Sequence, residues 1–354
     1  MIIGVAGTAK NTGKTTTLCA LIDEAYRRGR LPGVTGIGYD GEERDTVTLL
    51  PKPRITVHPG MIVTTSARCL AASTARLRMI RSTGYQTALG DVTICRVEES
   101  GLVVVAGPNK TADLAAVSQQ MLALGVADLL VDGSLNRIAP MAVADRVVVA
   151  TGAARNTDVQ YLTEETCAIE SIFARGATTE DLSAITGIRM RSRELTVQAP
   201  ATPVHGISEI ARVFERMPEG LEEIVLPGLI TADGLGVVCE RMERAGGRGV
   251  TLVFDDPFKM LLAGEPVRIG VLLRRLHDLS VDVRYRRPSD LCAFTFNPSY
   301  PAFDGTTYRP ASLDAASGRA SLAAALRTPV VDVKQDGVAT IYDACFSVIR
   351  PSIE

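Results

Sequence analysis

The sequence contains no tryptophan, and aromatic residues make up only 5% of its 354 positions. Stacking platforms for single-stranded nucleic acid need aromatic side chains, so we do not expect such a surface here. Basic and acidic residues are nearly balanced, at 38 and 40, and the net charge is −2. This balance provides no basic patch for nucleic acid or for an anionic membrane. We therefore expect no nucleic acid and no membrane among its partners.

Long apolar runs, paired cysteines and clustered histidines are missing as well. Apolar segments such as GLVVVAG and DRVVVATG are far shorter than the roughly 20 residues that cross a bilayer. The N-terminus has neither the basic flank nor the cleavage site of a signal peptide. The seven cysteines form no C-x-x-C pair, and the three histidines are widely spaced, so we expect neither a disulfide framework nor a zinc site. These features indicate a cytoplasmic protein with reduced cysteines.

Apolar segments alternate with helical patterns through the first half of the chain. Residues 14–28 and 111–124 repeat apolar positions at helical spacing, and both are expected to be helices. Short, nearly all-apolar strands between helices are typical of a parallel sheet that is covered on both faces. The expected strands are MIIGVAG, GVTGIG, DLLVDG and DRVVVATG. The stretch PRITVHPGMIVTT is expected to form a β-hairpin that turns at Pro59-Gly60.

A chain of this length favours two domains. The stretch VQAPATPVHG, at residues 197–206, is rich in breakers, and we place the boundary there. Residues 1–200 would form a nucleotide-binding domain, and residues 201–354 a second, smaller α/β domain. In the second half, EEIVLPG, GLGVVCERMERAGG and VTLVFDD are expected to form a βαβ unit, and CAFTFNP and PVVDV to add strands. The sequence thus predicts an α/β protein.

The loop GTAKNTGKTTT stands between the first predicted strand and helix, and it is suited to phosphate. Gly13 permits close backbone approach, Lys14 can reach the β- and γ-phosphates, and the Thr15 hydroxyl can bind Mg²⁺. The alternative is that Thr12 merely caps the helix while Lys14 is solvated. The nucleotide-binding candidates are Thr8, Ala9, Lys10, Asn11, Thr12, Gly13, Lys14, Thr15 and Thr16.

The spacing of this loop narrows its class. Five residues separate Gly7 from Gly13, whereas the strict phosphate-loop pattern would place its first glycine at position 8, which is Thr8. The loop instead resembles the G-T-x-x-x-x-G-K-T loop of dethiobiotin synthetase and of the cobyrinic and cobyric acid synthases. These enzymes belong to a P-loop class related to the MinD/ParA ATPases, which carry an extra lysine five residues before the invariant one. Here that position is Ala9, and Lys10 follows it. One interpretation is therefore a homodimer in which Lys10 reaches the partner's site. The alternative is that Lys10 is an exposed loop lysine.

Three acidic residues, at a strand end and in a loop, complete the expected catalytic set with Lys14. The strand in ADLLVDGSLNR ends at Asp132, where a second magnesium-directed carboxylate belongs, although Asp-Gly pairs also make simple turns. The loop after the second strand carries an acidic cluster, and in the class that the loop resembles a switch loop there orients the attacking water. Asp40 and Asp45 are the favoured candidates, and a solvated acidic loop is the alternative.

The expected nucleotide is ATP rather than GTP. The segment GPNKTAD resembles the guanine-reading N-K-x-D motif, but Asp113 comes one residue late and the segment precedes Asp132, which reverses the order found in GTPases. Residues 150–156 (ATGAARN) are the candidate adenine-side loop. In the second half, LPGLITADGL and the VFDDPFKML residues Asp255, Asp256 and Lys259 are interpreted as structural turns rather than ligand sites.

The order of these segments resembles the P-loop (KamB-like) subunit of the lysine 5,6-aminomutase reactivase. The segments that carry the resemblance are YDGEERDTVTLLPKPRITVHPG, VAGPNKTADL, LLVDGSLNR, VVVATGA, LPGLIT and VFDDPFKML. The resemblance implies an ATP-dependent subunit that works with a MutS-like second subunit. Together they would exchange damaged cobalamin in an aminomutase that uses adenosylcobalamin and pyridoxal phosphate. Two alternatives remain: an ATP-dependent small-molecule ligase or kinase of the dethiobiotin-synthetase type, and a structural protein with a relic site, which the intact GKTTT disfavours.

Overall fold

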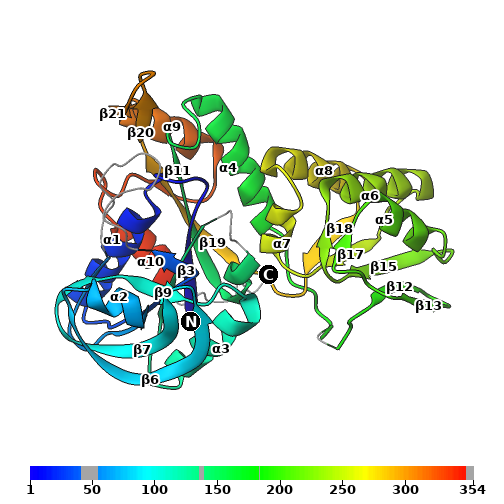
Figure 1. Cartoon of the computed structure of the whole chain (residues 1–354). Helices are drawn as coiled ribbons and strands as arrows, with labels where there is room; N and C mark the ends of the chain where they lie inside the picture. The colour runs from blue at the N-terminus through cyan, green and yellow to red at the C-terminus, as the bar shows by residue number, and fades with distance from the viewer. Residues whose placement is uncertain (41–54, 135–138, 183, 348–354) are drawn as a thin grey trace. The chain divides into compact units, whose positions relative to one another are not determined.

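The computed structural model describes residues 1–40, 55–134, 139–182 and 184–347 (Figure 1). The chain forms two compact units, which do not follow the expected boundary at residue 200. The first unit combines Met1–Thr163 with Leu291–Glu354, and the second consists of Glu164–Asp290. The C-terminal segment therefore returns to the unit that contains the N-terminus.

The first unit is built on a mixed sheet, and the expected α/β class is confirmed at this level. Its nine described strands lie in the order β22-β19-β11-β1-β10-β2-β5-β7-β6. Five adjacent strands are parallel to one another: β11, β1, β10, β2 and β5. Strand β22 is parallel to β19, and β7 is antiparallel to both β5 and β6. The bounds are β1 Ile2–Gly7, β2 Gly33–Gly36, β5 Ile62–Ser66, β6 Arg76–Thr87, β7 Gly90–Glu99, β10 Leu129–Ser134, β11 Arg146–Gly152, β19 Asp290–Asn297 and β22 Val330–Val331.

Strand β1 lies at the point where the connections of the sheet change direction. From β1 the chain passes through α1 (Lys14–Arg27) to β2, on the far side of β10. From β10 it passes through the 3₁₀ helix η2 (Ala139–Val143) to β11, on the opposite side of β1. In open α/β sheets, ligands bind outside the carboxyl ends of the strands at such a switch point. The loop that leaves β1 occupies this position.

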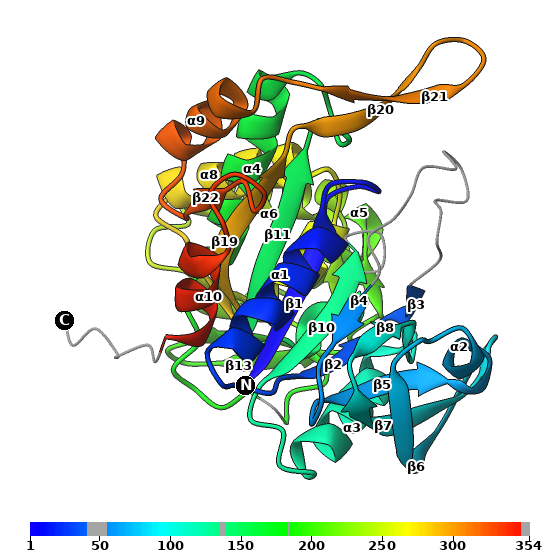
Figure 2. The same cartoon turned by 90° about the vertical axis from the view of Figure 1, so that its left-hand side faces the viewer.

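Helix α1 and the C-terminal helix α10 (Ala339–Phe346) share one apolar core with the sheet. Leu18 and Leu21 of α1 pack in the same fully buried cluster as Ile3 and Val5 of β1, which alternate along their strand. Burying each such side chain contributes about 1.5–3 kcal/mol. The cluster also includes Ala293 of β19, Val331 of β22, and Ile341, Tyr342, Cys345 and Phe346 of α10. Figure 2 shows α10 beside α1 on this side of the sheet.

The return of the C-terminal segment explains why the sequence-based boundary does not match the compact units. CAFTFNP and PVVDV do form strands, as expected, but β19 and β22 extend the first sheet beyond β11. Arg146 of β11 fixes the end of α10 by donating to the carbonyl oxygens of Cys345, at 2.6 Å, and Ser347, at 2.7 Å. A change of composition near residue 200 marks an irregular connection, whereas the unit is defined by which apolar faces are buried together.

The prediction of a β-hairpin that turns at Pro59-Gly60 is wrong. Strand β4 (Ile55–Val57) pairs antiparallel with β8 (Gly101–Val103), while β5 joins the main sheet between β2 and β7. Strand β3 (Gly38–Asp40) pairs antiparallel with β9 (Val105–Gly107). All five residues of β5 are buried, so this strand is placed by burial rather than by the turn before it.

The remaining described elements of the first unit are helices and one separate hairpin. Helices α2 (Ala67–Ala71), α3 (Thr111–Leu122) and α9 (Ala315–Ala325) belong to it, and α4 (Val159–Phe173) contains the division between the units. Strands β20 (Ser299–Phe303) and β21 (Tyr308–Ser312) form a two-stranded hairpin directly after β19, which projects from the first unit (Figure 2). Among the described residues, no helix combines the length and the hydropathy required to traverse a bilayer.

The second unit contains the expected βαβ arrangement. Its sheet has the order β13-β12-β15-β17-β18, with β15, β17 and β18 parallel and β12 antiparallel to both of its neighbours. The strands are β12 Ile188–Ser192, β13 Thr196–Ala199, β15 Leu221–Leu226, β17 Thr251–Phe254 and β18 Asp282–Tyr285, with β14 (Val204–His205) and β16 (Leu229–Ile230) as a separate pair. The helices are α5 Ile207–Phe214, α6 Ala232–Ala245, α7 Pro257–Leu262 and α8 Pro266–Asp278.

Two phenylalanine substitutions test the placement of β19 in the interior of the first unit. Phe294 in β19 is fully buried, so Phe294→Ala is expected to lower the free energy of unfolding by about 3–5 kcal/mol through lost burial and the resulting cavity. Phe303 in the projecting hairpin is 59% exposed, so Phe303→Ala should change it by less than about 0.5 kcal/mol. Urea denaturation of both variants measures this, and equal losses would contradict the placement.

Candidate functional site

The loop from β1 to α1 is fixed by hydrogen bonds to β11 and within itself. The Thr8 N–H donates to the carbonyl oxygen of Ala150 at 2.9 Å, and its hydroxyl donates to that of Thr151 at 3.2 Å. The Thr12 hydroxyl donates to the carbonyl oxygen of Ala9 at 2.9 Å, which closes the loop on itself. Thr12 is therefore not the cap of the helix, contrary to one of the two interpretations of the sequence.

Two residues of this loop adopt left-handed backbone conformations. Asn11 has φ 64° and Gly13 has φ 92°. A left-handed conformation costs most residues roughly 1–2 kcal/mol. The cost is smaller for asparagine, and glycine has none because it lacks a Cβ. These two positions turn the chain sharply just before the helix begins.

Gly13 is the N-cap of α1, and it has no side chain with which to cap this helix. The first bond of the α1 ladder described here runs from the Thr17 N–H to the Gly13 carbonyl oxygen, at 2.9 Å. The first N–H groups of a helix have no acceptor within it, and the helix dipole adds partial positive charge at the same end. The N–H groups of Lys14, Thr15 and Thr16 therefore lie at an end of the helix that is suited to an anion.

Lys14 and Asp132 form an ion pair at the carboxyl ends of two neighbouring strands. Val5 of β1 is in register with Asp132 of β10, so the loop after β1 and the end of β10 lie at the same edge of the sheet. The Lys14 Nζ donates to Asp132 Oδ1 at 2.5 Å. The side chains are only 16% and 2% exposed, so the pair is largely desolvated, and the interpretation of Lys14 as a solvated residue does not hold.

Strand β19 supplies a residue to this loop that the sequence did not indicate. The Asn297 Nδ2 donates to the carbonyl oxygen of Asn11 at 2.8 Å. Its own carbonyl oxygen accepts from the Ala153 N–H at 2.9 Å, and a Cβ added to Gly152 would lie 2.0 Å from that oxygen. The candidate adenine-side loop at 150–156 is thereby held against the end of β19. The Asn-Pro pair that follows the apolar strand in CAFTFNP was the only local signal.

The other expected site residues are only partly described. Lys10 is exposed, and Asp40 lies at the end of β3 with its backbone paired to Val105. The side chain of Asp40 and the whole of Asp45 lie outside the described residues. Their predicted role in orienting water stays a prediction.

A magnesium ion is compatible with the residues that are described at this site. Mg²⁺ favours oxygen ligands and takes one or two from the protein, the rest coming from phosphates and water. Thr15 lies in the first turn of α1, and Asp132 lies in the C-terminal half of β10. Within the described ranges, no group of three or more His, Cys, Asp and Glu side chains is arranged to bind a metal by itself.

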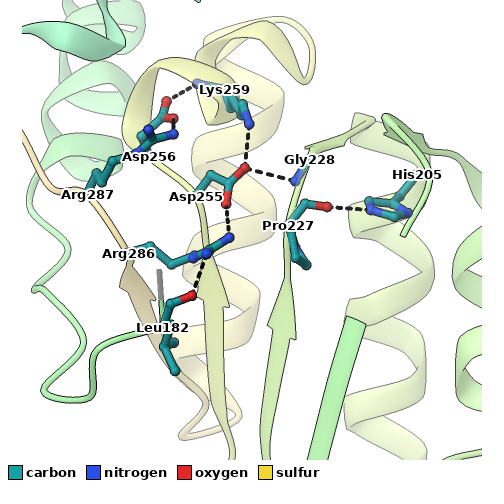
Figure 3. Close-up of polar contacts among 9 residues, drawn as sticks. All are labelled: Leu182, His205, Pro227, Gly228, Asp255, Asp256, Lys259, Arg286 and Arg287. Carbon is teal, nitrogen blue, oxygen red and sulfur yellow. Dashed lines mark hydrogen bonds and ion pairs between the residues drawn. The ribbon is translucent and has the colours of Figure 1, made fainter. Parts of the chain in front are cut away.

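The second unit carries a separate polar cluster at the carboxyl ends of its parallel strands (Figure 3). Asp255, directly after β17, is 5% exposed. It accepts from Lys259 Nζ, from the Gly228 N–H at 2.9 Å and from Arg286 at 2.9 Å. Burial raises the pKa of Asp255, but the Lys259, Gly228 and Arg286 contacts outweigh it and lower the pKa overall. The cluster thus stabilises the ionised form of Asp255.

The neighbouring polar residues of this cluster are bonded as well. Asp256 caps α7 by accepting from the Lys259 N–H at 2.8 Å, and burial raises the pKa of the Asp256 carboxyl. His205 Nε2 is 2.7 Å from the carbonyl oxygen of Pro227, and its Nδ1 is 3.1 Å from the Thr202 hydroxyl. These contacts fix the turns after β15 and β17, in line with the structural interpretation of VFDDPFKML.

Comparisons with models of protein families, with curated proteins and with solved structures find no match for this chain. Its function is therefore inferred from its own residues and their geometry.

Glycine at position 152 should be required where β11 meets Asn297. Gly152 has φ 148°, and an added Cβ would meet the main chain of Asn297, so Gly152→Ala is expected to cost about 3 kcal/mol or more in the free energy of unfolding. Gly125 is the matched control because it has φ 87° with nothing within 4 Å, and Gly125→Ala should cost only about 1–2 kcal/mol. Equal losses in urea denaturation would show that the close approach is absent.

Proposed function

We propose that this chain is a P-loop NTPase that binds ATP with Mg²⁺ and hydrolyses it. The ion pair of Lys14 with Asp132 carries this proposal. It joins the lysine of a glycine-containing loop to a carboxylate on the adjacent parallel strand, at the open N-terminus of a helix and at the switch point of the sheet. A lysine on the phosphates and a strand-end carboxylate directed at magnesium are the two charged parts that phosphoryl transfer in P-loop proteins requires.

Each residue has a distinct role in this proposal. The N–H groups at the start of α1 and the loop backbone at Gly13 would bind the phosphate oxygens, and Lys14 would contact the terminal phosphates. Thr15 and Asp132 would hold Mg²⁺, which supplies positive charge that offsets the charge of the phosphates. Asp40 and Asp45 are the proposed residues for orienting the attacking water.

The ion pair would change its partners when nucleotide binds. Without nucleotide, each of the two largely desolvated charges is stabilised by the other. A bound triphosphate offers Lys14 a second anionic partner. Asp132 could then turn its carboxylate to the magnesium ion or to a water on it. The loop and the end of β10 would therefore respond together to the presence of nucleotide.

We propose further that hydrolysis serves a partner protein. The resemblance to the reactivase P-loop subunit supports an ATP-driven assistant to a cobalamin-dependent aminomutase, acting with a MutS-like subunit. Such an assistant works by differential binding of a partner in its nucleotide-bound and nucleotide-free states. The dethiobiotin-synthetase-type ligase differs in that a small acid would receive the phosphate.

Substitutions of the ion pair should separate nucleotide binding from hydrolysis. Lys14→Ala is expected to weaken ATP binding about 100-fold or more because charge-assisted contacts to phosphate are lost. Asp132→Asn keeps the shape of the side chain and should spare ATP binding while abolishing most magnesium-dependent hydrolysis. Calorimetry and a phosphate-release assay measure the two effects.

Two further variants control this experiment. Asp128→Asn removes a carboxylate just before the N-terminal end of β10, and it should leave both ATP binding and hydrolysis unchanged. The double variant Lys14→Ala/Asp132→Asn removes both charges of the ion pair, so it separates lost binding from lost stability. Unchanged ATP affinity in both Lys14 variants would refute the proposed site.

The partner is tested by turnover with and without lysine 5,6-aminomutase carrying damaged cobalamin. A reactivation subunit should hydrolyse ATP faster when the aminomutase and the MutS-like subunit are present, and Lys14→Ala should remove this stimulation. Transfer of phosphate to an added carboxylic acid, with no effect of the aminomutase, would instead identify the ligase.

A further inference from the structure

Two residues on one face of strand β19 contact α1 and the loop between β1 and α1 (residues 8–13), which we call the nucleotide loop. Thr295 and Asn297 are two residues apart, so their side chains point to the same side of the strand. The hydroxyl of Thr295 lies 3.0 Å from that of Thr17 in α1, and both residues are buried. Asn297 reaches the loop itself through its bond to the Asn11 carbonyl oxygen. The end of β19 therefore supports both the helix and the loop that precedes it.

The side chain of Asn297 is held in one orientation. While its Nδ2 donates to Asn11, its Oδ1 accepts from the Ser299 N–H at 3.2 Å. Its Cβ also lies 3.3 Å from where a Cβ on Gly13 would stand. The contacts at both ends of the amide fix which atom faces the loop. Asn297 thus presents a fixed donor to the loop.

The bond to the Asn11 carbonyl determines the orientation of a loop peptide. Asn11 is in the left-handed conformation, which the loop must maintain with a residue that is not glycine. In a trans peptide the C=O and the following N–H point in opposite directions. Holding the Asn11 oxygen toward Asn297 therefore directs the Thr12 N–H away from it. A single hydrogen bond thus sets the direction of the Asn11–Thr12 peptide, two residues before Gly13.

We propose that Asn297 is a positioning residue for nucleotide binding, which orients the Asn11–Thr12 peptide so that the loop is preorganised for a triphosphate. This inference rests on the proposed function. It assigns to the C-terminal part of the chain a share in the phosphate site, exerted through Asn11. A preorganised loop binds more tightly because less ordering remains to be done when the ligand arrives.

The test measures binding of a non-hydrolysable ATP analogue with Mg²⁺ by calorimetry on the full chain. Asn297→Ala should raise the Kd about tenfold, while its thermal midpoint should show that the protein is folded. Glycine adopts the left-handed conformation without penalty, so Asn11→Gly should make the loop less dependent on Asn297. In the Asn11→Gly background, Asn297→Ala should therefore raise the Kd only about threefold.

Controls keep this proposal separate from the proposed function. Phe303→Ala changes the hairpin just after β19 and should leave the Kd unchanged. If Asn297→Ala does not fold, Asn297→Asp, which keeps the size of the side chain and the acceptor for Ser299, is measured in the same two backgrounds. The same Kd with and without Asn297, or the same loss in both backgrounds, would overturn the positioning role. Wild-type affinity in Lys14→Ala would overturn the proposed nucleotide site instead.

Discussion

Two opposite charges that are both largely withdrawn from water constrain this structure. Lys14 and Asp132 come from segments more than a hundred residues apart, and their pairing at 2.5 Å requires that β1 and β10 lie side by side in parallel. Removing one partner of such a largely desolvated pair weakens the stabilisation of the other charge. The pair therefore fixes the loop to the C-terminal part of β10.

The discontinuous first unit follows from how the apolar surface of α1 is covered. The side of the sheet that carries α1 also receives α10, and β19 extends the sheet beyond β11, so residues after 290 complete a core that residues before 163 begin. The second unit is inserted between the two parts. The same return of the chain that fills the core brings Asn297 to the nucleotide loop, which connects the stability of the fold with the geometry of the site.

The two units place polar residues at strand ends for different purposes. In the first unit, a helix terminus with glycine as its N-cap, a lysine and the carboxylate of Asp132 lie at the switch point. In the second, Asp255 is neutralised by Lys259 and Arg286, and Asp256 caps a helix of its own. Carboxylates that already stabilise their own turn and cap have less capacity for an added ligand, so the chemistry proposed for this protein belongs to the first unit.

Local sequence patterns determined the individual elements well. The expected strands and helices around residues 2–7, 14–28, 111–124 and 146–152 are confirmed to within a few residues, as is the βαβ unit at 221–254. The spacing of GKTTT and the strand ending at Asp132 also located two of the charged residues that the structure brings together. Such signals are predictable because helical and strand periodicity, and the glycine needed before the helix, depend on neighbours along the chain.

Tertiary structure alone decided the partners of those elements. The hairpin at Pro59-Gly60 does not form, β19 and β22 join the first sheet, and Asn297 contacts Asn11 across 286 positions of sequence. Local patterns do not determine these contacts, because the arrangement is selected by the total apolar surface that it buries, and that sum involves segments from the whole chain. The sequence therefore determined what each segment is, and long-range burial determined what each segment touches.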